Sequence, residues 1–220
     1  MKKKLAVFLL LTAMLGMCAC GSKDPEVTPT KTVDTFLKAI QDEDQDAIKK
    51  VYEESTFDIG KEAWDDTDGE DDEDELDASD DSVRNVLVKD FYPRLIKFEY
   101  KMGEEKIDGD SATVTVDITT YKMGDAFVSG FKDFFSQAMD LYNSNASDEE
   151  VSKVMADSLH KKLSGLKKKE YTKTATFHLS KEDGKWVIDE MDDDDNEAAL
   201  NALTGGMIDA THKIDKMTEK

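Results

Sequence analysis

The sequence predicts an α+β fold, in which helices pack on one face of an antiparallel sheet. Three observations support this prediction. Apolar residues recur at helical spacing before and between the strand-like segments. The strand-like segments themselves alternate apolar and polar side chains with a period of two. Asp-Gly dipeptides lie where antiparallel hairpins need tight turns. At 220 residues, the chain is long enough to bury the core of one domain.

Two helices are expected ahead of the sheet. Val33, Phe36, Leu37 and Ile40 follow the i, i+3, i+4, i+7 spacing of an amphipathic helix. The polar stretch 42–46 interrupts this pattern, and a second helix is expected at 47–52. A third helix is expected at 83–91, with apolar residues on one face. It should end near Pro93, because proline lacks the backbone N–H and clashes with the preceding turn.

An acidic segment separates the second and third helices. Residues 65–81 hold twelve Asp or Glu in seventeen positions, which predicts a solvated loop. Aligning Gly69 with the invariant glycine of an EF-hand loop places three candidate calcium ligands at their positions: Asp66, Asp68 and Glu75. Trp64 would then occupy the first ligand position, and it cannot bind a cation. Diffuse attraction of cations is therefore preferred over a defined calcium site, although the calcium site stays open as an alternative.

The first two strands flank the turn Asp108-Gly109-Asp110. Apolar and charged residues alternate over 96–102, and apolar residues alternate with Thr and Asp over 112–119. One face of this hairpin should therefore meet the helices, and the Thr-rich face should meet water.

A helical insert is expected at 125–168. Its first helix carries a stripe of phenylalanines, Phe127, Phe131, Phe134 and Phe135, and Ser147–Glu150 forms a capping box that opens its second helix. The preferred interpretation is that this stripe packs on the sheet. The alternative is that it closes a cavity or binds an apolar ligand.

Two more strands and a short helix complete the domain. Residues 171–179 and 186–190 read as strands joined by a turn at Asp183-Gly184, and a helix should stop at Gly205-Gly206. The domain is therefore expected to span 31–206. The tail 207–220 is either a weak amphipathic helix or disordered.

The N-terminus predicts export and anchoring. Three lysines precede a thirteen-residue apolar run that ends at Met17, and Cys18, Ala19 and Cys20 follow. This arrangement resembles a bacterial lipoprotein signal, in which a small residue precedes the acylated cysteine. The resemblance implies a signal peptide at 1–19, diacylglycerol and palmitate on Cys20, and a lipidated tether at 20–30. The protein would then lie at the cell membrane, on its extracytoplasmic side.

A second resemblance concerns the domain itself. The Val33–Ile40 helix, the Lys181–Trp186 hairpin and the run from Asp192 to Gly206 resemble nuclear transport factor 2-like (cystatin-like) domains and small Gram-positive lipoproteins of that type. The resemblance covers 31–124 and 170–206, and the insert departs from it. It implies a conical cavity, which in this superfamily hosts isomerases, dehydratases or no catalysis at all.

The sequence offers little to a catalytic interpretation. Tyr100 and Tyr121 are candidates to reach a cavity ligand, whereas His160, His178 and His212 are expected on the solvated surface. Asp192–Asp195 should point in different directions and not form a metal site. A net charge of −21 excludes nucleic acid, because phosphates need clustered cations. The expected function is a non-catalytic binding module, without cofactor, for an envelope protein or small molecule. A cavity enzyme and a calcium-dependent module are the alternatives.

Overall fold

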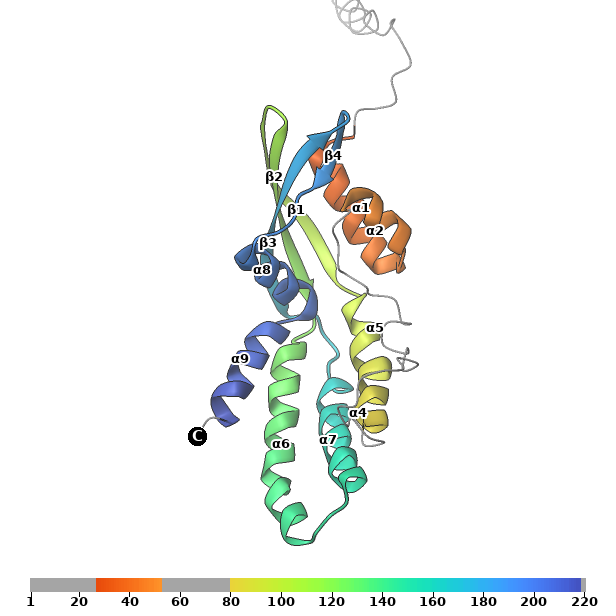
Figure 1. The fold of residues 1–220 in the computed structure, drawn as a ribbon, viewed down its shortest axis with the longest axis vertical. Coiled ribbons are helices and arrows are strands. Elements are labelled where there is room, and N and C mark those ends of the chain that lie inside the picture. The colour runs from red at the N-terminus through yellow and green to blue at the C-terminus, as the bar shows by residue number, and fades with distance from the viewer. Residues whose placement is uncertain (1–26, 53–79, 219–220) are drawn as a thin grey trace, which may run out of the picture.

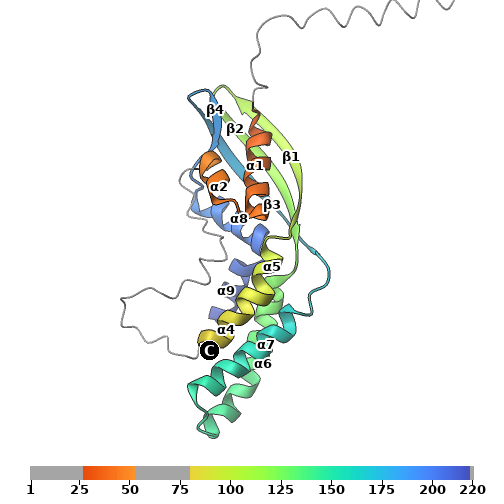
Figure 2. The ribbon, with the colours of Figure 1, turned by 90° about the vertical axis from the view of Figure 1, so that its right-hand side faces the viewer.

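The computed structural model describes residues 27–52 and 80–218. A four-stranded antiparallel sheet in the order β1-β2-β3-β4 occupies one end of an elongated molecule, and a bundle of helices occupies the other (Figure 1, Figure 2). The α+β prediction is confirmed. The elements in chain order are α1 (Pro29–Asp42), α2 (Gln45–Val51), α4 (Asp80–Val86), the π-helical turn η1 (Leu87–Phe91), α5 (Tyr92–Leu95), β1 (Glu99–Asp108), β2 (Ser111–Thr120), α6 (Met123–Asn143), α7 (Asp148–Leu163), β3 (Tyr171–Glu182), β4 (Lys185–Ile188), α8 (Asp193–Thr204) and α9 (Met207–Thr218).

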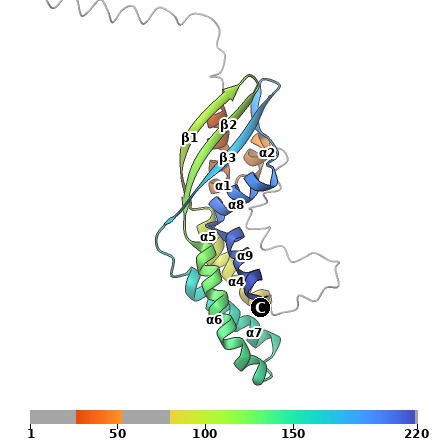
Figure 3. The same ribbon diagram turned by 90° about the vertical axis from the view of Figure 1, so that its left-hand side faces the viewer.

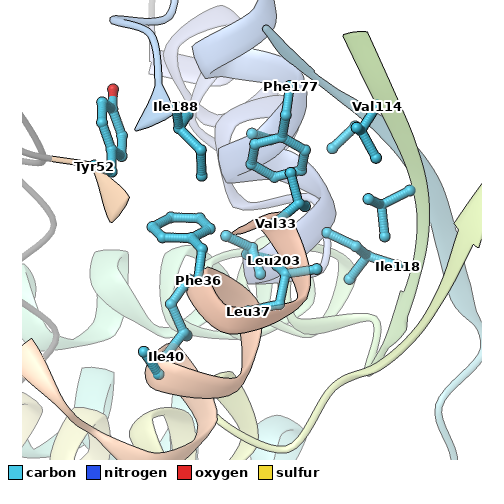
Figure 4. Packing of buried hydrophobic residues seen from close by; sticks show 14 of the residues in the cluster. Val33, Phe36, Leu37, Ile40, Tyr52, Val114, Ile118, Phe177, Ile188 and Leu203 are labelled. Carbon is cyan, nitrogen blue, oxygen red and sulfur yellow. The ribbon is translucent and has the colours of Figure 1, made fainter. Parts of the chain in front are cut away.

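Helix α1 begins where its sequence supplies a start signal. The Thr28 side chain accepts a hydrogen bond from the backbone N–H of Lys31, and Pro29 occupies the first turn, where no N–H is needed. The apolar face then packs into the concave side of the sheet. Phe36 makes edge-on ring contacts with Tyr52 and Phe177, at 5.8 Å between ring centres in both pairs (Figure 4).

The sheet has one buried and one open face. On the buried face, α1, α2 and α8 cover the inward side chains of all four strands, including Val116, Phe177 and Trp186. The open face is turned toward the viewer in Figure 3, with α1 behind the strands. Threonine hydroxyls line β2 and β3 on this face, and those of Thr119 and Thr172 hydrogen-bond at 2.9 Å. The expected division into an apolar and a Thr-rich face is confirmed. The interior between α1 and the sheet is filled by side chains of this core.

A β-bulge in β1 redirects the end of that strand. Gly103 and Glu104 together face Thr115, and a Cβ at Gly103 would collide with the Thr115 hydroxyl. Beyond the bulge, Glu105 lies on the α1 side of the sheet, and its carboxylate accepts from both the N–H and the hydroxyl of Thr30, at 2.8 and 2.6 Å. The start of α1 is thereby held near the β1–β2 turn.

The helix that was expected to end near Pro93 continues to Leu95. The chain widens into the π-helical turn η1, in which the N–H of Tyr92 reaches the carbonyl of Leu87, and α5 follows with Pro93 in its first turn. The wider turn displaces the carbonyl that the proline ring would otherwise strike, so the helical path survives. As a result, β1 begins at Glu99, later than the alternation from residue 96 predicted.

The helical insert forms α6 and α7 between β2 and β3, as expected, but it does not pack on the sheet. Its buried residues join a second apolar cluster with α4, η1 and α5, and α9 packs along α6. The preferred interpretation of the phenylalanine stripe is therefore wrong. The apolar face of α6 was identified correctly, but helical spacing does not reveal which element covers it. Of the two alternatives for the tail, residues 207–218 adopt the helical one.

The two clusters meet at a close backbone crossing. Gly205 has φ 64° and ends α8 as predicted, and its carbonyl accepts from the N–H of Gly124 at 3.0 Å. A Cβ at Gly205 would collide with the carbonyl oxygen of Tyr121, and one at Gly124 with that of Gly206. Both positions therefore require glycine for close approach, and Gly205 requires it for its left-handed conformation as well.

Several predictions lie outside the described residues, namely the signal peptide 1–19, Cys20, and the calcium candidates Asp66, Asp68 and Glu75. Two predicted boundaries are corrected, because Pro29 and Thr30 of the expected tether belong to α1, and α4 begins at Asp80 within the expected acidic loop. Within 27–52 and 80–218, no helix has the length and apolarity needed to cross a bilayer.

Candidate functional site

The end of α6 is closed by a hydrogen-bonded turn that is encoded locally. Asn145 takes a left-handed conformation, with φ 51°. The N–H of Ala146 donates to the carbonyl of Leu141 at 3.1 Å, and the N–H of Asn145 donates to that of Tyr142 at 3.2 Å. These two bonds constitute a Schellman motif, which satisfies the last carbonyls of the helix. Asparagine suits the left-handed position, because among non-glycine residues it tolerates it well.

The start of α7 is capped by the predicted capping box. The Ser147 hydroxyl accepts from the N–H of Glu150 at 3.3 Å, and the Glu150 carboxylate accepts from the N–H of Ser147 at 2.9 Å. The turn between α6 and α7 therefore holds its shape through its own hydrogen bonds, independently of the rest of the molecule.

We call the end of the α6–α7 hairpin, with this turn, the hairpin tip. A pocket of about 730 Å³ opens there. Its volume falls in the range of small-molecule and side-chain binding sites. Its lining combines apolar side chains of both helices with polar groups, namely two amides, one carboxylate and one tyrosine hydroxyl. The lining residues are Phe134, Ala138, Leu141, Tyr142, Asn143, Asn145, Ala146, Asp148 and Val151.

Aromatic rings extend this surface along α6. Phe134 contacts Phe131 and Phe135, with ring centres 6.1 and 5.8 Å apart. Phe135 is 44% exposed, and Tyr142 at the rim is 81% exposed. Large aromatic side chains left in water at the same place as a pocket are typical of a binding surface.

The hairpin tip is also strongly acidic. Between Phe134 and Ser152 the chain carries four carboxylates and no lysine or arginine, the carboxylates being Asp140, Asp148, Glu149 and Glu150. The nearest ion pair between the two helices, Lys162 with Asp133 at 2.8 Å, lies deeper in the hairpin. That contact, together with Lys161, lowers the pKa of Asp133. The tip therefore combines a pocket of mixed apolar and polar lining with four carboxylates.

Chemically, this arrangement suits binding. The residues that line the pocket include no histidine, serine, cysteine or lysine, and their titratable side chains are those of Tyr142 and Asp148. Among all described residues, no three His, Cys, Asp or Glu side chains gather as a metal site.

The two tyrosines proposed from the sequence do not converge on one cavity. Tyr100 packs at the edge of the sheet core, and its hydroxyl donates to Asp34 at 2.7 Å. Tyr121 belongs to the helical cluster, and the guanidinium of Arg94 stacks over its ring at 5.9 Å. Each tyrosine therefore has a structural contact in a different half of the molecule.

The Tyr100–Asp34 contact is part of a charged cluster on α1. Burial disfavours the charged form of Asp34, but hydrogen bonds from Lys31, Lys38 and Tyr100 outweigh it and hold the pKa of this carboxyl well below its usual range. Burial and the neighbouring carboxylate raise the pKa of Tyr100 above that of free tyrosine. This contact ties α1 to β1.

A second polar pair, not anticipated from the sequence, lies in the helical half. Asp90 is buried in the π-helical turn, and its carboxylate lies 2.6 Å from Nδ1 of His160 on α7. Arg94 approaches the same carboxylate at 3.9 Å and donates to the Asp90 carbonyl. The pair thus joins the π-helical turn to α7.

The remaining predicted surface residues lie where the sequence placed them. His178 is exposed on the open face with Nε2 3.1 Å from Asp195, and His212 is exposed on α9. Asp192 caps α8 by accepting from the N–H of Asp195 at 2.9 Å, so this acidic run begins a helix.

Sequence reasoning missed the pocket and the Asp90–His160 pair. Asn145 beside the predicted capping box was the available sign of a closed turn, and Pro93 within a helical pattern was the available sign of an irregular one. Compared with family models, with curated proteins and with solved structures, the chain gives no match.

Proposed function

We propose that this chain is a lipid-anchored, extracytoplasmic binding module that presents the hairpin tip away from the membrane. The observation that carries the proposal is the position of the open, aromatic pocket relative to the start of α1. Thr30 is bonded to Glu105 near the β1–β2 turn, whereas α6 leaves the opposite end of β2 (Figure 1).

The anchor and the tip are therefore expected at opposite ends. The seven peptide bonds between Cys20 and Val27 span at most about 25 Å, so acylation of Cys20 would keep the sheet near the bilayer. Helix α6, with 21 residues, is about 30 Å long and extends away from the sheet. Cleavage before Cys20 would also remove three lysines and take the net charge from −21 to −24.

Two experiments test this proposal. Cys20→Ala should release the protein from the membrane fraction. Cys18→Ala is the control, because bulky Met17 precedes Cys18 and the signal requires a small residue there. This variant should stay in the membrane fraction. Retention of Cys20→Ala after a salt wash would contradict lipid anchoring.

Binding at the tip is tested separately, by a photo-crosslinking amino acid in intact cells. Placed at Tyr142, which is 81% exposed, it should give discrete adducts. Placed at Ile107, which is 54% exposed at the other end, it should not. Equal labelling at both positions would mean that the tip is no special surface.

The cavity-enzyme alternative gains no support from the sheet interior, which Phe36, Ile40 and Phe177 fill. We therefore propose no catalytic role.

A further inference from the structure

We propose that the hairpin tip binds a basic amphipathic segment of a partner protein, with apolar side chains in the pocket and lysines or arginines against its acidic rim. This proposal rests on the function proposed above and adds the class of ligand. Its basis is the coincidence of a pocket that is lined by both apolar and polar groups with four carboxylates in one short stretch of chain.

The pocket selects an amphipathic ligand. Phe134, Ala138, Leu141 and Val151 offer apolar contact from two antiparallel helices. A helix that docks in such a groove places side chains at i, i+3, i+4 and i+7 into it. The Tyr142 ring at the rim is of the residue type that dominates binding energies at interfaces.

The rim selects the sign of charge. Asp148 lines the pocket, and Asp140 and Glu149 are exposed beside it. Glu150 is engaged in the capping box, so it contributes charge with a fixed position. An acidic segment, or an anionic membrane surface, would meet repulsion here, whereas a basic segment would be attracted and oriented.

The same charge argues against a second copy of this chain as the occupant. Two hairpin tips in contact would bring eight carboxylates together on two molecules of net charge −21 each.

Moreover, the Schellman turn and the capping box hold the rim before any partner arrives. A preorganised site loses less conformational freedom on binding.

The test uses the full lipoprotein in nanodiscs of zwitterionic lipid, with empty nanodiscs as background. The probes are peptides of about 15 residues, long enough for a marginal helix. The first peptide contains only leucine and lysine, with leucine at the i, i+3, i+4 and i+7 positions of an amphipathic helix and lysine elsewhere. The second replaces each lysine by glutamate, and the third replaces each leucine by alanine. We expect the first peptide to bind at least about tenfold more tightly than either of the others, with binding weakened as the Debye length falls from about 30 Å to about 3 Å.

Matched variants locate the site. Asp140→Asn with Glu149→Gln should weaken binding of the Leu/Lys peptide about fivefold, whereas Asp108→Asn with Asp110→Asn, at the opposite end, should leave it unchanged. Tyr142→Ser should weaken binding further, and Ile107→Ser should not. All these side chains are exposed, so the fold tolerates the changes.

The outcomes separate this inference from the proposed function. Equal binding of the Leu/Glu peptide, or equal effects of the two charge pairs, would overturn the inference. So would a dimer that Tyr142→Ser dissolves, because the occupant would then be a second copy. Adducts at Tyr142 in cells combined with no Leu/Lys binding would overturn the inference and leave the binding module in place. Absence of adducts at Tyr142 would overturn the proposed function itself.

Discussion

The sheet half and the helical half of this molecule bury their apolar residues to different extents. In the sheet half, Phe36, Val116 and Phe177 are almost completely excluded from water, and three helices share one concave face. In the helical half, α6 leaves Phe135 and Tyr142 in water beside an open pocket. The sheet half therefore buries its large apolar side chains almost completely, whereas the helical half leaves two aromatic side chains exposed.

In each half, the contacts that tie two elements together include a carboxylate paired with a tyrosine or a histidine. Asp34 joins α1 to β1 in the sheet half through Tyr100, and Asp90 joins the π-helical turn to α7 through His160. The two contacts differ in surroundings, because Asp34 also receives two lysines at the surface while Asp90 is buried. The comparison can be tested at several positions.

The largest expected difference concerns phenylalanines. Phe177→Ala removes a ring that lies at the centre of the sheet core, and it should lower the free energy of unfolding by about 3–5 kcal/mol. Phe135→Ala removes a ring that is 44% exposed, and it should cost less than about 1 kcal/mol. Urea unfolding measures both. Similar losses would mean that the exposed ring serves folding, and the contrast between the halves would fail.

The junction between the halves gives the next effect. Gly205 and Gly109 have nearly the same backbone conformation, with φ 64° and 63°, but only at Gly205 would a Cβ collide with another backbone segment. Gly109→Ala should therefore cost about 1 kcal/mol for its conformation alone. Gly205→Ala should cost about 2–3 kcal/mol and speed hydrogen exchange at the ends of β2 and α8. Equal costs would show that the crossing is not tightly packed.

A smaller effect is expected at the Asp90–His160 pair. His160→Ala would remove the nearest partner of a buried carboxylate, at a cost of about 1–2 kcal/mol. His212→Ala, on the exposed face of α9, should change the unfolding free energy by less than about 0.5 kcal/mol. A double-mutant cycle with Asp90→Asn measures the coupling energy directly. A value near zero would mean that the pair does not stabilise the fold.

The smallest effect is the pH dependence that Asp34 contributes. Because its pKa is lower in the folded protein than in the unfolded chain, its stabilisation is complete above the ordinary Asp value of about 3.9 and is lost as the pH falls below it. Wild type should therefore exceed Asp34→Asn by no more than about 1 kcal/mol at neutral pH, and the gap should close in acid. Thermal unfolding of both proteins from pH 7 to pH 2 measures this gap, and a gap that widened in acid would contradict the assignment.

The alternation in β2 and the Asp108-Gly109 turn were sufficient to predict the sheet and its faces, because a period of two leaves only one way to bury Val114, Val116 and Ile118. The destination of the insert was not predictable in the same way. The spacing of Phe127 and Phe131 identifies an apolar face, but many surfaces can cover such a face. Likewise, the pairing of Asp90 with His160 spans seventy residues and depends on a π-helical turn that has no simple sequence pattern.

The self-contained turn at Asn145 has a consequence for how such a protein diversifies. Residues at the rim can change in evolution without disturbing the sheet, since the turn is held by bonds to its own neighbours. Adding seven residues to each of α6 and α7 would move the tip outward by about 10 Å while keeping the same helix faces inward. The side chains at the rim and the length of the hairpin can thus vary independently of the sheet and its core.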